Sequence, residues 1–232
     1  MYCSFQVKII MKGTIFVDYK LLNSNDDSSL ENKLNKLLAS GVDEILVKPV
    51  FMSDGFEVNK LRERLSPFEG KGRFRKIEFG IPVLGSRESL NDFAEILIHE
   101  IGFKSEYEYL LVGHGLSGSD NKEYSELSDL LHSKDFSNVE VACLTGKGDI
   151  YSYLEKVQKA GLINKKVQVY PLMIQAGHHV TKDIVELVQF LEENGLQVIN
   201  NCVPLSSFES FKARYMDESK NQISNSVVIM RG

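Results

Sequence analysis

The sequence predicts an α/β protein made of two similar halves, each a parallel sheet flanked by helices and related by internal duplication. The segment VQVYPLMIQAGHHVTKD (167–183) matches ILVKPVFMSDGFEVNKL (45–61) at an offset of 122 residues, with Pro171 on Pro49. Further identities are Gly177 on Gly55, Val180 on Val58 and Lys182 on Lys60. Short apolar runs also alternate with helical patterns, which is typical of parallel βαβ units.

The first half is expected to begin with the strand TIFVD (14–18), a short run rich in β-branched and aromatic residues. Two more strands are expected, at 45–49 and 74–83. Leucines at helical spacing predict a helix from Leu30 to the stop at Gly41. Two further helices are expected at 58–65 and, between a Ser86 cap and a Gly102 stop, at 87–101.

The second half is expected to start with a strand at 106–112, followed by the turn Gly113-His114-Gly115. Further strands are expected at 139–144, 167–171 and 196–203. Helices are expected at 124–132, 150–160, from a Thr181 cap to Gly195, and at 208–216. The tail, 217–232, is polar up to Val227–Met230, so it either is disordered or adds one edge strand.

The two halves differ in length. Tyr19 and Pro49 are 30 positions apart, whereas His114 and Pro171 are 57 apart, and the difference of 27 matches one strand–helix unit. The first sheet is therefore expected to have three strands and the second four. The predicted boundaries are 11–103 for the trimmed N-terminal half, 104–216 for the C-terminal half and 217–232 for the tail.

Composition excludes several classes of protein. The chain has 232 residues, of which 43% are hydrophobic and 25% charged, as in ordinary soluble proteins. Its formal charge of −5 argues against a nucleic-acid partner. The three cysteines, Cys3, Cys143 and Cys202, form no CxxC pair and favour the reducing cytoplasm. There is no apolar run of about 18 residues, so no membrane partner is expected.

Motifs of common enzyme classes are incomplete. The segment GLSGS (115–119) lacks the final glycine of a nucleophile elbow, and TGKG (145–148) lacks the spacing of a phosphate-binding loop. No GxGxxG follows the first strand, so a dinucleotide fold has no fingerprint. The sequence gives no support to a hydrolase, an NTPase or a dinucleotide-binding enzyme.

Two histidines follow strands at the edge where parallel α/β sheets bind ligands. His114 sits between two glycines, which are expected to leave room for a ligand. His179 follows Gly177 at the start of a helix, whose positive end favours the neutral imidazole that metals require. We expect His114 and His179 to bind a divalent metal together, the alternative being structural histidines at strand ends. His99 and His132, on helices, are expected at the surface.

The duplication places Glu57 where the second half has His179. A carboxylate at this position is a candidate proton acceptor or supporting carboxylate, the alternative being an ordinary glutamate in the first turn of a helix. Imidazole and oxygen ligands suit cobalt, nickel, iron or zinc, so ligand type leaves the metal open.

The motifs LLVGHG (110–115), VYPLMIQAGHHVTKD (169–183), VKPVFMSDGFEV (47–58) and GIPVLGS (80–86) resemble the anaerobic-type sirohydrochlorin cobaltochelatases of the class II chelatase superfamily. The resemblance covers about Met11 to Met216. It implies two chelatase-like halves around a cleft, and a cytoplasmic lyase that inserts divalent cobalt, its substrate, into the tetrapyrrole sirohydrochlorin for cobalamin biosynthesis without ATP. Alternatives are insertion of iron or nickel, or a degenerate relative that binds tetrapyrrole or metal without catalysis.

Carried onto this chain, the resemblance makes His114 and His179 the metal ligands. His114 and Glu57 are then the candidate catalytic residues. The family's third ligand, a glutamate, falls in CLTGKGD (143–149), where this chain has Thr145. Thr145, Lys147 and Lys182 are candidates for binding the substrate, the lysines through the carboxylates of the tetrapyrrole.

Overall fold

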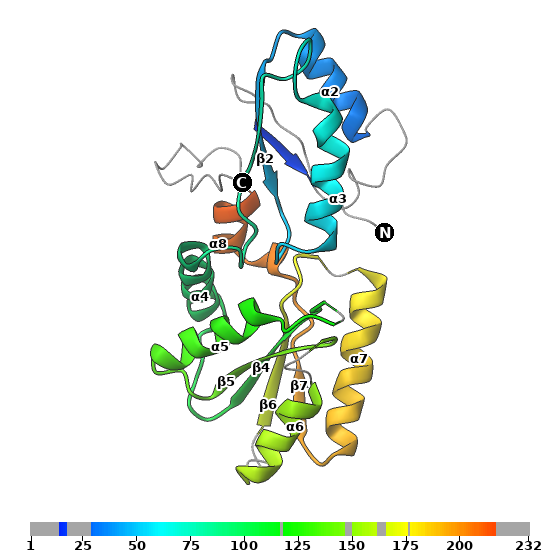
Figure 1. Ribbon diagram of the computed structural model, residues 1–232. Coiled ribbons are helices and arrows are strands. Elements are labelled where there is room, and N and C mark those ends of the chain that lie inside the picture. Colours follow the sequence, from blue (N-terminus) through cyan, green and yellow to red (C-terminus); the bar gives the residue numbers. More distant parts are fainter. Residues whose placement is uncertain are drawn as a thin grey trace. The chain divides into compact units, whose positions relative to one another are not determined.

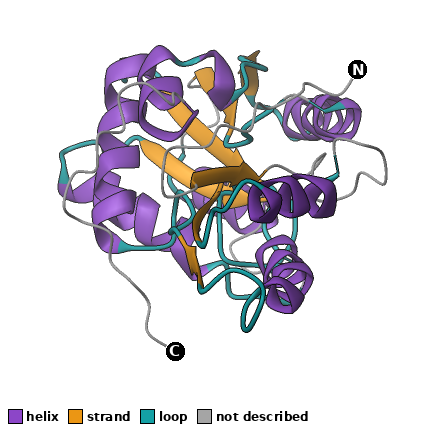
Figure 2. Ribbon diagram, turned by 90° about the horizontal axis from the view of Figure 1, so that it is seen from above, coloured by secondary structure: helices purple, strands orange, loops and turns teal. Residues whose placement is uncertain are grey.

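The structure is a computed structural model that describes residues 14–17, 29–116, 118–146, 150–161, 166–175 and 177–216, with 14–17 and 178–181 described by their backbone alone. The chain divides into two compact units. The larger spans Leu90–Lys212, and the smaller contains the chain up to Ser89 together with the stretch from Ala213. In Figure 2 the described chain consists of helices and strands in the mixture typical of an α/β protein.

The smaller unit contains one parallel sheet in the order β1-β2-β3. Its elements are β1 (Thr14–Val17), α2 (Leu30–Ala39), β2 (Glu44–Pro49), α3 (Phe56–Leu65), the short 3₁₀ helix η1 (Ser66–Phe68) and β3 (Lys76–Phe79). The hydroxyl of Ser29 caps α2 by accepting a hydrogen bond from the Asn32 backbone, 3.3 Å away. Buried side chains from α2, α3 and β2 form one apolar core: Leu30, Leu34, Leu37, Ile45, Val47, Leu61 and Leu65.

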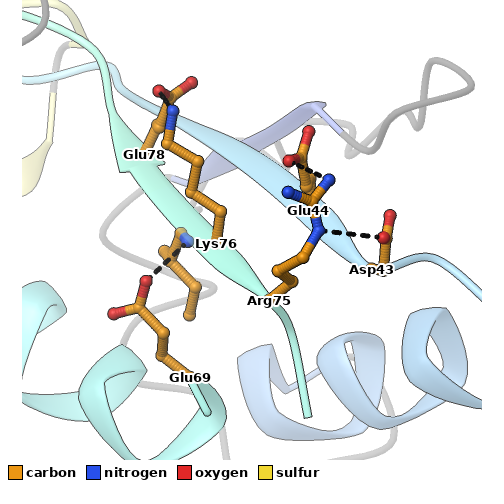
Figure 3. Close-up of polar contacts among 7 residues, drawn as sticks. Asp43, Glu44, Glu69, Arg75, Lys76 and Glu78 are labelled. Atoms are coloured by element: carbon orange, nitrogen blue, oxygen red, sulfur yellow. Dashed lines mark hydrogen bonds and ion pairs between the residues drawn. The ribbon is translucent and has the colours of Figure 1, made fainter.

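Ion pairs lie where β2 and β3 begin, as Figure 3 shows. Arg75 pairs with Asp43 at 3.3 Å and with Glu44, while Lys76 of β3 pairs with Glu78. Glu69 accepts a hydrogen bond from the backbone of Ile77 at 3.1 Å. Arg75 and Asp43 are more than two-thirds exposed, so their ion pair contributes little to the stability of the fold.

The larger unit contains a four-stranded parallel sheet in the order β5-β4-β6-β7 (Figure 1). Its strands are β4 (Glu108–Gly113), β5 (Val139–Cys143), β6 (Lys166–Pro171) and β7 (Gln197–Asn200). Its helices are α5 (Lys122–Ser133), α6 (Ile150–Lys159), α7 (His178–Glu193), η3 (Leu205–Ser207) and α8 (Glu209–Phe211). Helix α4 (Arg87–Ile101) and the π-helical turn η4 (Lys212–Met216) join the two units.

Helices cover both faces of the larger sheet (Figure 1). On one face, Leu110 and Val112 of β4 pack in a core with residues of α6 and α7. On the other, the ring of Tyr124 from α5 lies against the backbone of Gly113. Strand β4 is buried at all six positions, which explains why YLLV reads as a continuous apolar run.

The predicted fold class is confirmed, and the described residues form three strands in one unit and four in the other. Both bounds of β6, Lys166 and Pro171, lie 122 residues after those of β2, Glu44 and Pro49. The helix N-caps Gly55 and Gly177 are also 122 residues apart. This repeated spacing supports the duplication. The segment with no counterpart in the smaller unit contains β5 and one flanking helix.

Several predicted boundaries are wrong. Helix α7 begins at His178 with Gly177 as its N-cap, so Thr181 lies inside the helix and is not the cap. Strands β3 and β7 are shorter than predicted, because they end at Phe79 and Asn200, before Pro82 and Pro204 are reached.

The predicted helix at 208–216 is a short α-helix followed by a π-helical turn. The compact units divide between Ser89 and Leu90, inside α4, whereas the sequence places the boundary after Phe103. The ring of Phe93 in α4 meets that of Phe211 edge-on, with centroids 6.0 Å apart, which ties most of α4 to the larger unit. The tail, including Val227–Met230, lies outside the described residues.

Candidate metal-binding site

The turns after β4, β5 and β6 lie at one edge of the larger sheet. Strand β4 pairs with β5 on one side, where Gly113 is opposite Cys143, and with β6 on the other, where Val112 is opposite Pro171. His114 follows β4 directly and is exposed. The edge therefore brings together the backbone turns that carry His114, Thr145 and the start of α7.

The ring of His114 has a defined hydrogen bond. Its Nδ1 atom lies 2.9 Å from the backbone oxygen of Gly115. Because a carbonyl oxygen can only accept, Nδ1 must donate. In the neutral ring the lone pair is then on Nε2, the atom that can bind a metal.

The glycines on either side of His114 allow other residues of the protein to pack closely against the backbone of this turn. A Cβ atom on Gly113 would lie 2.2 Å from the ring of Tyr124. Gly115 has a φ of +72°, and a Cβ atom there would lie 2.3 Å from the backbone oxygen of Thr145. The sequence interpretation, that these glycines leave space for a ligand, is corrected: neighbouring protein atoms fill the space at both positions.

Thr145 donates two hydrogen bonds to the backbone oxygen of His114, which holds the two residues side by side. The backbone N–H of Thr145 donates to the carbonyl of His114 at 3.1 Å, and its hydroxyl donates to the same carbonyl at 3.0 Å. The only hydroxyl proton is thus directed to the backbone, and the oxygen lone pairs are left for another donor or a cation. The nearby Cys143 is buried, and burial raises the pKa of its thiol to about 12, so it is protonated in the metal-free protein.

Asn121 is the residue of this region that sequence reasoning missed. Its side-chain oxygen accepts from the Leu116 backbone at 2.9 Å, and its Nδ2 donates to the Thr145 carbonyl at 2.7 Å. Asn121 is buried, and its backbone adopts the left-handed conformation, with φ of 47°. The available signal was an asparagine directly before a helix in the polar loop SGSDN, because asparagine tolerates this backbone conformation.

His179 is the second residue of α7, so its backbone lies in the first turn, at the positive end of the helix dipole. Its side chain lies outside the described residues. Among the side chains that are described, no three histidine, cysteine or acidic groups converge as a metal cluster would require. The joint site of His114 and His179 stays a prediction.

The other candidates occupy different positions. Lys182 of α7 is exposed and forms an i,i+4 ion pair with Glu186, 3.5 Å away. Lys147 lies outside the described residues. In the smaller unit, Glu57 is the second residue of α3, in a turn held by the two-pronged pairing of Arg62 with Asp54 at 2.8 and 2.9 Å.

Comparison with known proteins identifies the family. The family model described as cobalt chelatase (CbiK) matches residues 20–224, most of the chain. The chain belongs to the cobalt chelatase family. No curated protein matches this cobalt chelatase family member in sequence.

Solved structures share its fold at low sequence identity. SirB from Bacillus subtilis with Fe3+ aligns at 15% identity and a TM-score of 0.56, covering 86% of this chain and 82% of SirB. The sirohydrochlorin chelatase SirB from Bacillus subtilis subspecies spizizenii, in complex with cobalt, aligns at 14% identity and 0.51, with coverages of 77% and 70%. A multi-domain, chelatase-like protein from Deinococcus radiodurans aligns at 16% and 0.52, covering 73% of this chain and 39% of that protein.

In this cobalt chelatase family member, none of the described helices has both the length and the apolar surface needed to cross a bilayer.

Proposed function

We propose that this protein inserts divalent cobalt into sirohydrochlorin, with release of two pyrrole protons as metal–nitrogen bonds form. Membership of the cobalt chelatase family supports metal chelation as the reaction class. The observation that carries the assignment of the site is the hydrogen bond from His114 Nδ1 to Gly115, because it leaves the Nε2 lone pair of an exposed imidazole free. The described side chains alone do not complete a metal site, so the proposal includes His179.

In this proposal His114 and His179 hold the metal loosely enough to transfer it. A neutral imidazole releases a divalent metal more readily than a thiolate would. Glu57 is proposed to accept a pyrrole proton, since a carboxylate is a suitable base at neutral pH. Thr145, Lys147 and Lys182 are proposed to contact the tetrapyrrole, the two lysines by charge-assisted hydrogen bonds to its carboxylates.

Two other functions are favoured by specific observations. Similar folds are known with Fe3+ and with cobalt, which makes an iron chelatase the second candidate, and nickel suits the same ligands. A relative that binds tetrapyrrole or metal without insertion is favoured by Thr145, a neutral residue where the resemblance implies a glutamate.

The test is an insertion assay. The full-length protein is incubated with sirohydrochlorin and Co²⁺, and in parallel with Fe²⁺ or Ni²⁺ under anaerobic conditions, while the absorption shift of the macrocycle is followed. We expect cobalt insertion well above the uncatalysed rate, and near-background rates for His114→Ala. A His99→Ala variant, altered at an exposed histidine on α4, is the control and should match the parent. If the parent gives only the uncatalysed rate with every metal, the protein is a binding relative and not a chelatase.

A further inference from the structure

We propose that Asn121 is a positioning residue for His114: it fixes the turn whose carbonyl holds the imidazole in the tautomer with a free Nε2. The importance of this tautomer for metal binding rests on the proposed function, whereas the structural link between the two residues does not.

Asn121 occupies the N-cap position of α5 but does not cap the helix with its side chain. Its amide instead joins two turns, accepting from the Leu116 N–H at 2.9 Å and donating to the Thr145 carbonyl at 2.7 Å. Both bonds are made by a residue that is only 3% exposed, so losing either would leave a polar group without water to replace it.

Gly115 lies between these two anchors. It precedes Leu116 directly, and its Cα faces the Thr145 carbonyl so closely that a Cβ atom would be 2.3 Å from that oxygen. Thr145 also donates two hydrogen bonds back to the His114 carbonyl. The backbone of residues 114–116 is therefore held from both sides, and with it the Gly115 oxygen that accepts from His114 Nδ1.

The position requires the properties of asparagine. The side chain must present one acceptor and one donor in a fixed plane, while the backbone adopts the left-handed region. The amide also packs on Gly146, where a Cβ atom would lie 2.4 Å from Nδ2. Aspartate would keep the acceptor but place a negative oxygen against the Thr145 carbonyl. Glycine would keep the backbone conformation but lose both hydrogen bonds.

Residues that orient a metal-binding histidine act through its second ring nitrogen, and their loss typically lowers metal affinity about 10–100-fold. Once residues 114–116 are released, the His114 ring is free to turn and to exchange its tautomer. A purely structural asparagine would change stability without changing the tautomer of one histidine. The tautomer is therefore the measurement that distinguishes the two roles.

The experiment uses ¹⁵N-histidine-labelled full-length protein, with the tautomer of each ring read from two-bond ¹H–¹⁵N correlation spectra. The spectra are recorded near pH 8.5, about two units above the ordinary histidine pKa, so that the rings are neutral. His114→Ala assigns the His114 signals by their loss. We expect the Nδ1–H tautomer in the parent, and a mixture with the Nε2–H tautomer in Asn121→Asp and Asn121→Gly. Cobalt affinity of both variants, measured by calorimetry, should fall about 10–100-fold.

The matched control is Asn138→Asp. Like Asn121, Asn138 bonds two backbone groups through its side-chain amide, in this case by donating to the carbonyls of Lys104 and Tyr107, but it lies where β5 begins, at the opposite edge of the sheet. This variant should keep the parental His114 spectrum and cobalt affinity. The inference is overturned if the parent His114 is not in the Nδ1–H form, or if the folded Asn121 variants keep its tautomer. If His114→Ala leaves the cobalt affinity at the parental value, His114 is not the metal ligand and that part of the proposed function is refuted. The tautomer of His114 in the Asn121 variants would still test whether Asn121 positions the imidazole.

Discussion

The hydroxyl of Thr145 donates a hydrogen bond to the backbone carbonyl of His114, 3.0 Å away. This contact places Thr145, the residue where the resemblance implies a glutamate, beside the proposed metal ligand, in the turn that follows β5. A threonine hydroxyl is a weak neutral ligand, whereas a carboxylate adds a charge-assisted bond to a metal and can accept a proton.

Thr145→Glu should therefore tighten cobalt binding and raise or create insertion activity. A tenfold gain in affinity needs only about 1.4 kcal/mol, which one anionic ligand can supply. Thr145→Val, which removes the hydroxyl but adds no charge, is the control and should gain nothing. The affinity for Co²⁺ measured by calorimetry and the rate of insertion should both rise in the glutamate variant. A folded glutamate variant with unchanged cobalt affinity would show that this side chain does not face the metal.

Gly115→Ala should destabilise the protein more than Gly102→Ala. Both glycines are left-handed, with φ of +72° and +63°, so alanine costs each about 1–2 kcal/mol of backbone strain. A Cβ atom at Gly102 meets nothing within 4 Å, but at Gly115 it would lie 2.3 Å from the Thr145 carbonyl. We expect an additional loss of about 1–3 kcal/mol for Gly115→Ala, measured by urea denaturation. If both variants lost the same free energy of unfolding, the turn at Gly115 would have to shift easily to accept a Cβ atom, which would contradict the tight packing against Thr145.

Glu100 should make the stability of the larger unit depend on acid pH. Its carboxylate accepts a hydrogen bond from the Ser210 backbone in the first turn of α8, 2.7 Å away. Burial acts to raise the pKa of Glu100, but the hydrogen bonds from Ser210 and the charges of His99 and Lys212 outweigh it and lower the pKa below 4.5. The stabilisation is therefore complete above pH 4.5 and is lost as pH falls through the lower, folded-state pKa.

Glu100→Gln keeps an acceptor for Ser210 but removes the charge. Because solvent screens this partly exposed carboxylate, we expect it to lower the free energy of unfolding by only about 0.5 kcal/mol at neutral pH, and by less at about pH 3, where the parent carboxyl also becomes protonated. Glu106→Gln, at an exposed glutamate of the same unit, should show neither effect. A difference between parent and Glu100→Gln that stayed constant with pH would contradict the assignment.

The sheets were predictable because local patterns determine them. Strand β4 is buried along its length and is a nearly continuous apolar run, and the spacing between His114 and Pro171 revealed the additional strand of the larger unit. The start of α7 was not predictable in the same way. Capping preferences favour the hydroxyl of Thr181, whereas the observed cap, Gly177, makes no side-chain hydrogen bond and leaves little trace in the sequence.

The candidate site was predictable only in part. The position of His114 after a buried strand follows from the sequence, but the role of Asn121 depends on a bond to Thr145, 24 residues away. The glycines of the GHG motif were predicted to leave space for a ligand, but Tyr124 and Thr145 occupy that space. The prediction was wrong for the same reason, because both residues approach from other parts of the chain. Local patterns place a residue on an element, whereas its contacts depend on how distant turns meet.

The most direct test of the account is the cobalt affinity of the variant that carries both His114→Ala and His179→Ala, measured by titration calorimetry beside the parent and His99→Ala. If these two histidines hold the metal, the double variant should lose cobalt binding while the His99→Ala control keeps the parental affinity. A folded double variant that binds cobalt as tightly as the parent would contradict the account.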